Sequence, residues 1–213
     1  MTQSVKQHPR FGWDDYQRWP DEQRWEIIAG EAFDMSPTPT PRHQAIVGEL
    51  YAALRPYFAG KRCRLFLAPL DVKLSDQDVV QPDLFVVCER KKIKPTHIDG
   101  APTLVIEVVS PSTELHDRIR KTRLCAAFGV KEFWLVTPYP WLVEVFVLGG
   151  KSYRLQRSYS KDDTLRSPTF RGLAVALRSV FAFPLEPGEE IRMVREGRPK
   201  YGKVAVNLPG GNA

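Results

Sequence analysis

Few cysteines, no long apolar run and no internal repeat characterise this sequence, and each absence excludes a class of protein. The three cysteines, Cys63, Cys88 and Cys125, lie far apart, without the two-residue spacing of zinc knuckles or redox motifs. We therefore expect neither a zinc site nor a disulfide framework. The start, MTQSVKQHPRFGWDD, lacks the apolar core of a signal peptide, and no apolar stretch approaches the roughly 18 residues of a membrane span. These absences predict a cytoplasmic protein with reduced thiols.

The composition is that of an ordinary globular domain with a basic balance. The 213 residues suffice to close a full hydrophobic core, and 43% of them are apolar and 26% charged. Lysine and arginine number 31 against 25 aspartate and glutamate, which gives a net charge of +6. A positive charge favours contact with polyanions such as nucleic acid, although many basic proteins have no such partner. Composition alone therefore leaves the partner open.

Hydrophobic patterning divides the chain into three segments. Residues 1–12 are expected to form an N-terminal extension, and residues 13–184 carry the periodic apolar residues of one domain. Residues 185–213 lose this periodicity and place lysine and arginine among glycine and proline, which predicts a basic C-terminal tail.

Within residues 13–184 the pattern predicts both helices and strands. The stretch WEIIAGEAFDM predicts a β-hairpin, and residues 41–58 predict a helix capped by Thr40 with Pro41 at its first position. The further expected elements are strands at 63–74, 78–88 and 103–109, a helix from SPST to Gly129, strands at 132–148 and 151–159, and a closing helix at 172–182. The order helix, strand, strand, strand, helix, strand implies a mixed sheet with helices packed on it, of α/β or α+β class.

Two carboxylates interrupt apolar strands. Glu107 lies within TLVIEVV, where it shares a strand face with Val105 and Val109, and Asp83 follows Pro82 at the start of LFVV. A buried carboxylate needs a cation, a metal or water. If the two strands are neighbours, the carboxylates lie side by side, and a divalent cation such as Mg²⁺ or Mn²⁺ would compensate their repulsion. An ion pair at a strand end and a turn residue are the simpler alternatives for Glu107 and Asp83.

The helix that follows Glu107 is rich in cations. Its positive residues are Arg118, Arg120, Lys121 and Arg123, and Asp117 lies one turn before Lys121. One interpretation is a solvated helix face, the commonest role of such a run. The other is that the lysine reaches the two carboxylates while the arginines hold phosphates.

These motifs, in this order, resemble the Uma-type family of restriction endonucleases within the PD-(D/E)xK nuclease superfamily. The resemblance rests on QPDLFVV, LVIEVVSPST, the Asp117 and Lys121 spacing, and FGVKEFWLVTP. It extends to WEIIAGEAFDMSPTPTPRHQAIVGEL near the start and SPTFRGLAVALRSVF near the end. The resemblance implies a restriction-endonuclease-like core with flanking helices and an added N-terminal β-hairpin.

The resemblance also implies a catalytic site. Asp83 and Glu107 would bind a magnesium ion that activates water against a phosphodiester. The superfamily's lysine usually follows the second acid by two residues, where this chain has Val109, and Lys121 takes that role in the Uma-type pattern. The tyrosine that the family usually shows is replaced here by Cys125.

Two residues of the N-terminal block match recurrent family positions. Glu26 is expected to complete the metal's ligands or act through water, with an exposed acid on a short strand as the alternative. His43 is expected to contact phosphate or to support the metal ligands, with a capping-region residue as the alternative.

The sequence thus supports one main hypothesis and two others. The main hypothesis is a Mg²⁺- or Mn²⁺-dependent endonuclease that hydrolyses DNA, expected as a homodimer because cleavage of a duplex needs two active sites or two events. The second is a nucleic-acid-binding or interaction module on the same fold whose hydrolytic machinery is impaired, as Val109 suggests. The third is a phosphohydrolase acting on sugars or nucleotides.

Overall fold

The computed structural model describes residues 10–20, 24–35, 39–109 and 114–183, and of residues 114–118 only the backbone. The chain divides into two units, Met1–Ala182 and Phe183–Ala213, and the description below concerns the first. The predicted basic tail, the helix start SPST and most of the predicted N-terminal extension lie outside the described residues.

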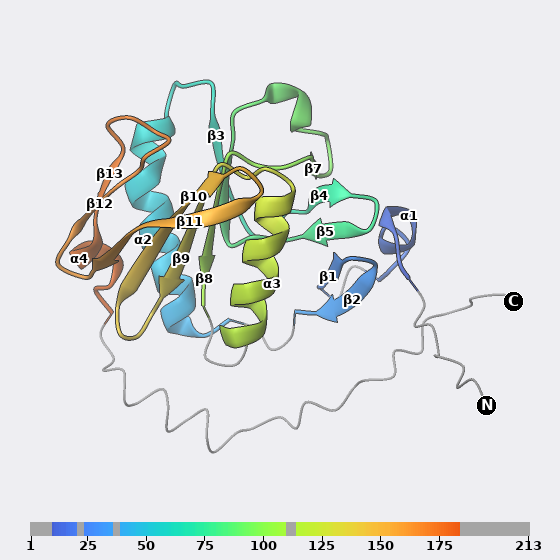
Figure 1. The fold of residues 1–213 in the computed structure, drawn as a ribbon, viewed down its shortest axis with the longest axis horizontal. Coiled ribbons are helices and arrows are strands. Elements are labelled where there is room, and N and C mark those ends of the chain that lie inside the picture. Colours follow the sequence, from blue (N-terminus) through green and yellow to red (C-terminus); the bar gives the residue numbers. More distant parts are fainter. Residues whose placement is uncertain (1–9, 21–23, 36–38, 110–113, 184–213) are drawn as a thin grey trace, which may run out of the picture. The chain divides into compact units, whose positions relative to one another are not determined.

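A six-stranded mixed sheet forms the centre of the first unit (Figure 1). Its strands, in spatial order, are β11 (Ser152–Ser160), β10 (Leu142–Gly149), β9 (Glu132–Thr137), β8 (Leu104–Val108), β6 (Leu84–Val87) and β3 (Arg64–Leu67). Strands β8 and β9 are parallel, and the other neighbours are antiparallel. The β10–β11 pair is the hairpin that the sequence predicts.

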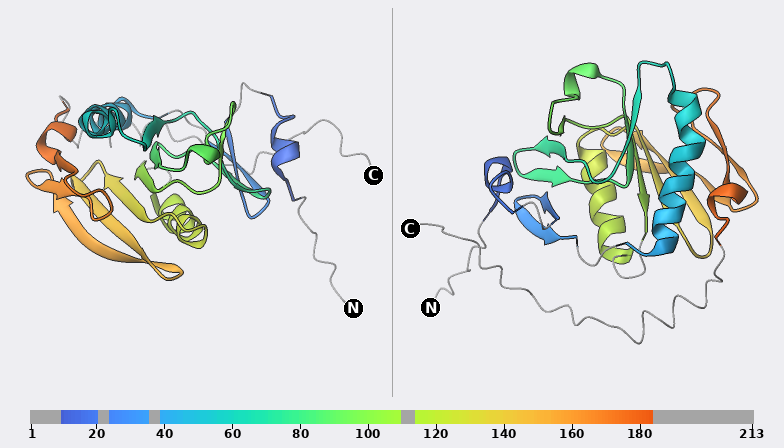
Figure 2. Two further views of the ribbon diagram at one scale, coloured as in Figure 1. Left: turned by 90° about the horizontal axis from the view of Figure 1, so that it is seen from above. Right: turned by 180° about the vertical axis from the view of Figure 1, so that it is seen from behind.

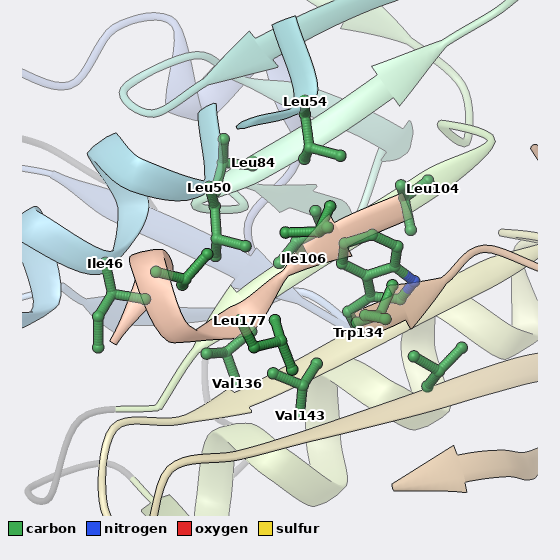
Figure 3. Packing of buried hydrophobic residues seen from close by; sticks show 14 of the residues in the cluster. Ile46, Leu50, Leu54, Leu84, Leu104, Ile106, Trp134, Val136, Val143 and Leu177 are labelled. Carbon is green, nitrogen blue, oxygen red and sulfur yellow. The ribbon is translucent and has the colours of Figure 1, made fainter. Parts of the chain in front are cut away.

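Two long helices cover opposite faces of this sheet (Figure 2). Helix α2 (Pro41–Phe58) packs Ile46, Leu50 and Leu54 against one face, where Ile106 and Trp134 face it (Figure 3). Helix α3 (Glu114–Ala127) packs Cys125 and neighbouring apolar residues against the other face. None of the helices in the described part of the chain is long and apolar enough to span a membrane.

A second, five-stranded sheet lies on the α3 side of the core. Its order is β2 (Glu31–Asp34), β1 (Trp25–Ile28), β5 (Asp78–Val80), β4 (Val72–Ser75) and β7 (Ile98–Asp99). The remaining elements are α1 (Trp13–Tyr16), a 3₁₀ helix (Arg90–Lys92), the pair β12 (Thr164–Arg166) and β13 (Ala174–Ala176), and α4 (Leu177–Val180). Strands β1 and β2 form the predicted N-terminal hairpin.

The predicted core elements occur in the expected order, with further strands between them. This order corresponds to α2, β3, β6, β8, α3 and β9, and the remaining strands add to this mixed α and β framework. Helix α2 begins as predicted, because the Thr40 hydroxyl accepts a hydrogen bond from the His43 backbone N–H at 3.2 Å and Pro41 occupies the first turn. This cap fixes the end of the helix that carries His43.

The two strands expected at 63–74 and 78–88 are in fact four, so this prediction was wrong. Each expected strand contains a proline, Pro69 or Pro82, where the chain crosses between the six-stranded and the five-stranded sheet. Proline has no N–H to give to a sheet ladder, so it favours such a break. The second crossing places Asp83 at the very start of β6.

The closing helix expected at 172–182 is only partly helical, because its first half contains a strand. Ala174–Ala176 pairs antiparallel with Thr164–Arg166, and only Leu177–Val180 is helical. Buried Leu173, Val175 and Leu177 alternate with exposed alanines, which is the period of a strand. Alanine is a strong helix former, and this local preference favoured the wrong element.

A disulfide joins Cys63 to Cys88, which corrects the expectation of reduced thiols at these two positions. The cysteines lie 25 residues apart in sequence. The antiparallel pairing of Arg64 with Val87 brings them opposite each other, just beyond the ends of β3 and β6. Sequence spacing does not reveal a pairing that depends on strand register. Cys125 is a free, buried cysteine.

Candidate active site

Asp83 and Glu107 lie side by side, because β6 and β8 are neighbours. The antiparallel register pairs Leu84 with Ile106, so the preceding Asp83 stands opposite Glu107. The Val108 backbone N–H donates a hydrogen bond of 2.8 Å to Asp83 Oδ2. The strand arrangement on which the predicted pair depends is therefore present.

Lys121 of α3 lies between two buried carboxylates. Its Nζ is 3.2 Å from Glu107 Oε1 and 3.0 Å from Glu26 Oε1. The sequence predicted that a helix lysine would reach Asp83 and Glu107. The ion pairs instead join it to Glu107 and Glu26, so a third acid takes part in the cluster.

Glu26 is buried on β1, and the alternative of an exposed acid was wrong. Its Oε1 accepts a 2.9 Å hydrogen bond from the Gln81 backbone N–H in addition to the Lys121 ion pair. The N-terminal hairpin therefore contributes directly to the charge cluster.

Gln81 is a residue that the sequence analysis missed. Its side-chain carbonyl accepts a 2.9 Å hydrogen bond from Arg24 Nε, and its amide nitrogen donates to Tyr16 Oη at 3.1 Å and to Asp71 Oδ1 at 2.8 Å. This buried side chain fixes the backbone from which Asp83 follows two residues later. A glutamine inside the apolar run VVQPDLFVV was the one available signal.

His43 is buried beside Asp83. Its Nε2 is 3.2 Å from Asp83 Oδ2, and its Nδ1 has no hydrogen-bond partner among the described residues. The Val108 N–H and His43 Nε2 both contact Oδ2 of the Asp83 carboxylate. Among the described residues, no hydrogen bond or ion pair reaches Oδ1. Because His43 is buried, it is better placed to support the Asp83 carboxylate than to contact phosphate directly.

The two carboxylates have opposite electrostatic environments. Burial raises the pKa of Asp83, but the hydrogen bond and charge of His43, the charge of Lys121 and the Val108 N–H outweigh it, so its pKa lies below the ordinary value. Burial raises the pKa of Glu107 well above its ordinary value, and the charges of Asp83 and Glu26 act in the same direction against Lys121. Asp83 is thus an anion at neutral pH, while Glu107 retains its proton more readily.

Comparison with known proteins matches most of this sequence to one family. The family described as "Uma2: Putative restriction endonuclease" matches residues 13–178. The chain belongs to this family. The resemblance seen in the motifs is thereby confirmed. The description of the Uma2 family names the same class of protein that the motifs imply, a nuclease.

Two individual proteins are similar to this Uma2 chain. "Uncharacterized protein slr1290" from Synechocystis sp. is 31% identical over 121 residues, which are 55% of this chain and 63% of that protein. The chain thus matches less than two thirds of the length of this relative. The crystal structure of a putative nuclease belonging to DUF820 from Anabaena variabilis has a TM-score of 0.66 and 23% identity, over 81% of this chain and 98% of that one. This likeness confirms the restriction-endonuclease-like fold.

The predicted arginines have different surroundings. The Arg120 guanidinium lies 3.9 Å from the centre of the Phe33 ring, and Arg123 is exposed on α3. The side chains of Arg118 and Asp117 lie outside the described residues. Cys125 is buried, and burial raises the pKa of its thiol.

The donor set fits a hard divalent cation in part. Glu107 Oε1 is buried and, among the described residues, is contacted only by the Lys121 ammonium, at 3.2 Å. With Asp83 it offers carboxylate oxygens of the kind that Mg²⁺ and Mn²⁺ prefer. Within the described ranges, however, no group of three or more His, Cys, Asp or Glu residues is arranged to hold a metal. The pair of carboxylates suits a cation that keeps several waters or substrate oxygens as ligands.

Proposed function

We propose that this Uma2 chain is a metal-dependent endonuclease that hydrolyses phosphodiester bonds of DNA. The observation that carries the proposal is the burial of Glu26, Glu107 and Lys121 in one charge cluster. Asp83 stands opposite Glu107 on the neighbouring strand. Structural needs alone rarely gather such a cluster, because each buried charge is costly. Membership in a family described as restriction endonucleases supports the same reaction class.

Asp83 and Glu107 would hold the cation directly, and Glu26, whose Oε1 is held by Lys121 and the Gln81 N–H, would act on it through a water. A bound Mg²⁺ or Mn²⁺ would supply Lewis acidity and a more acidic water, the chemistry that phosphodiester hydrolysis needs. The chain's own contribution is to hold Asp83 ionised through His43 and Val108 and to orient its carboxylate by contacts on Oδ2. Restriction-endonuclease-like families generally use divalent metals, which supports the assignment.

Lys121 takes the role of the superfamily lysine in this proposal. Its ammonium is held by ion pairs with Glu26 and Glu107. The positive charge is therefore fixed in position before a phosphate enters the site. Such a fixed cation stabilises negative charge that develops on phosphate in the transition state. Arg120, Arg123 and Arg118 are proposed to contact the nucleic-acid backbone.

A second candidate is a binding module whose hydrolytic machinery is impaired. The observation that favours it is that the described residues contain no metal-holding group of three ligands, together with Val109 in the usual lysine position. Metal titration distinguishes the two candidates, because an impaired module would show no binding heat that depends on Asp83.

Cleavage of plasmid and short duplex DNA by the purified full chain tests the proposal. We expect nicking or cutting with Mg²⁺ or Mn²⁺, none with EDTA, and a loss of about a thousandfold or more in Asp83→Ala and Lys121→Ala. Gln44→Ala on the exposed side of α2 is the matched control. Cleavage that is absent, or unchanged in Asp83→Ala, would contradict the assignment.

Three wider expectations stay predictions. They are the segment boundaries 1–12, 13–184 and 185–213, the homodimer, and the cytoplasmic location. Size-exclusion chromatography coupled to light scattering tests the homodimer directly, with twice the 24.3 kDa chain mass as the expected result.

A further inference from the structure

An aromatic pair with a cation, the exposed Tyr139 beside the partly buried Trp141, marks the turn between β9 and β10. Tyr139 is 55% exposed, the largest value among the large hydrophobic side chains that the structure describes as exposed. Its ring lies 5.6 Å from that of Trp141, edge to face, and Lys161 Nζ lies 4.1 Å above the Trp141 ring. The turn therefore presents the Tyr139 ring and the positive charge of Lys161 together to solvent.

The backbone of this turn is held in an unfavourable conformation. Trp141 has a φ of +58°, in the left-handed region that a bulky side chain rarely adopts. Outside glycine, such strain persists only where surrounding structure imposes it, and it concentrates at functional sites. The two acids next to Lys161 do not cancel its charge, because Asp162 pairs with Arg178 at 2.8 Å and Asp163 accepts hydrogen bonds from Ser160.

The turn lies at the end of the sheet that carries the acidic cluster. Strand β9 is parallel to β8 and pairs Leu135 with Glu107 and Val136 with Val108, so the turn begins just beyond the Glu107 end of β8. Neighbouring strands lie about 4.8 Å apart, which puts the turn within one or two strand spacings of this end. Figure 1 shows the β9–β10 turn and the end of β8 at the same edge.

A second aromatic and cation pair lies on the other side of the cluster. Phe33 pairs with Glu26 across the β1–β2 hairpin, so the two side chains share one face. Arg120 stacks on the Phe33 ring at 3.9 Å. In Figures 1 and 2 this hairpin and the β9–β10 turn lie on opposite sides of β8. The acidic cluster is thus flanked by two aromatic and cation pairs.

This arrangement matches the chemistry of an unpaired nucleic-acid strand. Unstacked bases offer flat π-faces that stack on aromatic rings and on guanidinium planes, and their phosphates pair with lysine and arginine. An intact duplex keeps its bases stacked on one another and offers no such faces along its length. Aromatic rings exposed beside the site therefore favour single-stranded or locally opened nucleic acid.

We propose that this chain binds unpaired DNA along this edge, with bases on Tyr139 and Trp141 at one end and against the Arg120 and Phe33 pair at the other. The phosphodiester between them would lie at Asp83 and Glu107. This inference rests on the proposed function of that acidic pair and names the substrate class on which it acts.

Fluorescence anisotropy of labelled DNA in EDTA, where no cleavage occurs, tests the proposal. The probes are a dT oligonucleotide and a duplex of equal length, titrated with the full chain. We expect the single strand to bind about tenfold more tightly or better, and Tyr139→Ala to weaken it by about 5- to 100-fold. Tyr139→Phe keeps the ring and should bind as the parent does. Lys161→Ala should lower the slope of log affinity against log salt by about 0.7.

The controls separate a local contact from a loss of folding and from failure of the enzyme. Leu155→Ala removes another exposed apolar side chain, 48% exposed on β11, and should leave the affinity unchanged. Unchanged single-strand affinity in Tyr139→Ala with an unchanged melting temperature, or equal binding of the duplex, overturns the inference. Aromatic-dependent binding without cleavage in Mg²⁺ or Mn²⁺ would support it and contradict the proposed nuclease.

Discussion

Glu132 and Glu107 are buried glutamates on neighbouring parallel strands, near opposite ends of that strand pair. Glu132 accepts hydrogen bonds from Trp134 Nε1 at 2.6 Å, Ser167 Oγ at 2.8 Å and the Thr169 N–H at 3.0 Å. Among the described residues, Glu107 Oε1 is contacted only by the Lys121 ammonium, which also pairs with Glu26. The same residue type therefore occupies a saturated environment on β9 and an unsaturated one on β8.

The difference shows what distinguishes a structural carboxylate from one suited to chemistry. The three donors to Glu132 belong to β9 and to the segment that leads to β13, so the carboxylate fastens one to the other. Glu107 lies among other carboxylates, which together with burial raise its pKa. A further cation would stabilise the Glu107 carboxylate, whereas the Glu132 carboxylate already accepts three hydrogen bonds.

Glu132→Ala should produce the largest change in stability. The substitution leaves a buried indole N–H, a hydroxyl and a backbone N–H without their acceptor, so we expect a loss of about 3 to 5 kcal/mol in the free energy of unfolding. Urea denaturation measures this quantity. A loss below about 1 kcal/mol would show that Glu132 does not fasten the β12–β13 segment.

Glu107→Gln should instead stabilise the metal-free chain, increasingly so at higher pH. The folded-state pKa of Glu107 is raised, so its contribution to stability is complete below its unfolded pKa and is lost as the pH rises through the folded pKa. The glutamine variant lacks this loss. Its advantage should therefore grow with pH by up to about 1.4 kcal/mol per unit within that window.

Thermal unfolding in EDTA between pH 5 and 8 measures the effect. The melting temperature of Glu107→Gln should rise relative to the parent as the pH rises. Gln44→Ala, which changes no ionisable group on the exposed side of α2, is the control and should show no such trend. A constant or shrinking difference for Glu107→Gln would contradict the unsaturated environment assigned to Glu107.

Gln81→Ala should weaken metal binding by about tenfold. The substitution removes the hydrogen bonds to Tyr16, Arg24 and Asp71 that fix the backbone before Asp83, while leaving the carboxylates themselves unchanged. Titration with Mn²⁺ measures the affinity, with Gln44→Ala as the exposed control. An unchanged affinity in a folded Gln81→Ala would show that Gln81 does not position the cluster.

Strand periodicity and motif order predicted much of the core and the pairing geometry of the site. Glu107 could be placed on one face of β8 because side chains alternate along a strand, and Lys121 because its helix follows directly. Gln81 could not be found in this way, since its partners Tyr16 and Asp71 are distant in the sequence. The register that brings Cys63 to Cys88 is likewise a property of the folded sheet.

The helix preference of individual residues predicted the wrong element where the same residues fit both the period of a helix and that of a strand. Residues 173–177, Leu-Ala-Val-Ala-Leu, combine alternation with helix-forming alanines, and only pairing with β12 decides for a strand. Pro69 and Pro82 were visible in the sequence, yet their effect depends on a second sheet being available to receive the chain.

Isothermal titration of the full chain with Mn²⁺ tests the central claim most directly. We expect binding by the parent that weakens as the pH falls, because Glu107 must lose its proton before it can serve as a ligand. In Glu107→Gln the affinity should fall by on the order of a hundredfold, while the folded control Glu132→Gln binds as the parent does. Equal Mn²⁺ affinity in Glu107→Gln and the parent would contradict the assignment of Glu107 as a metal ligand.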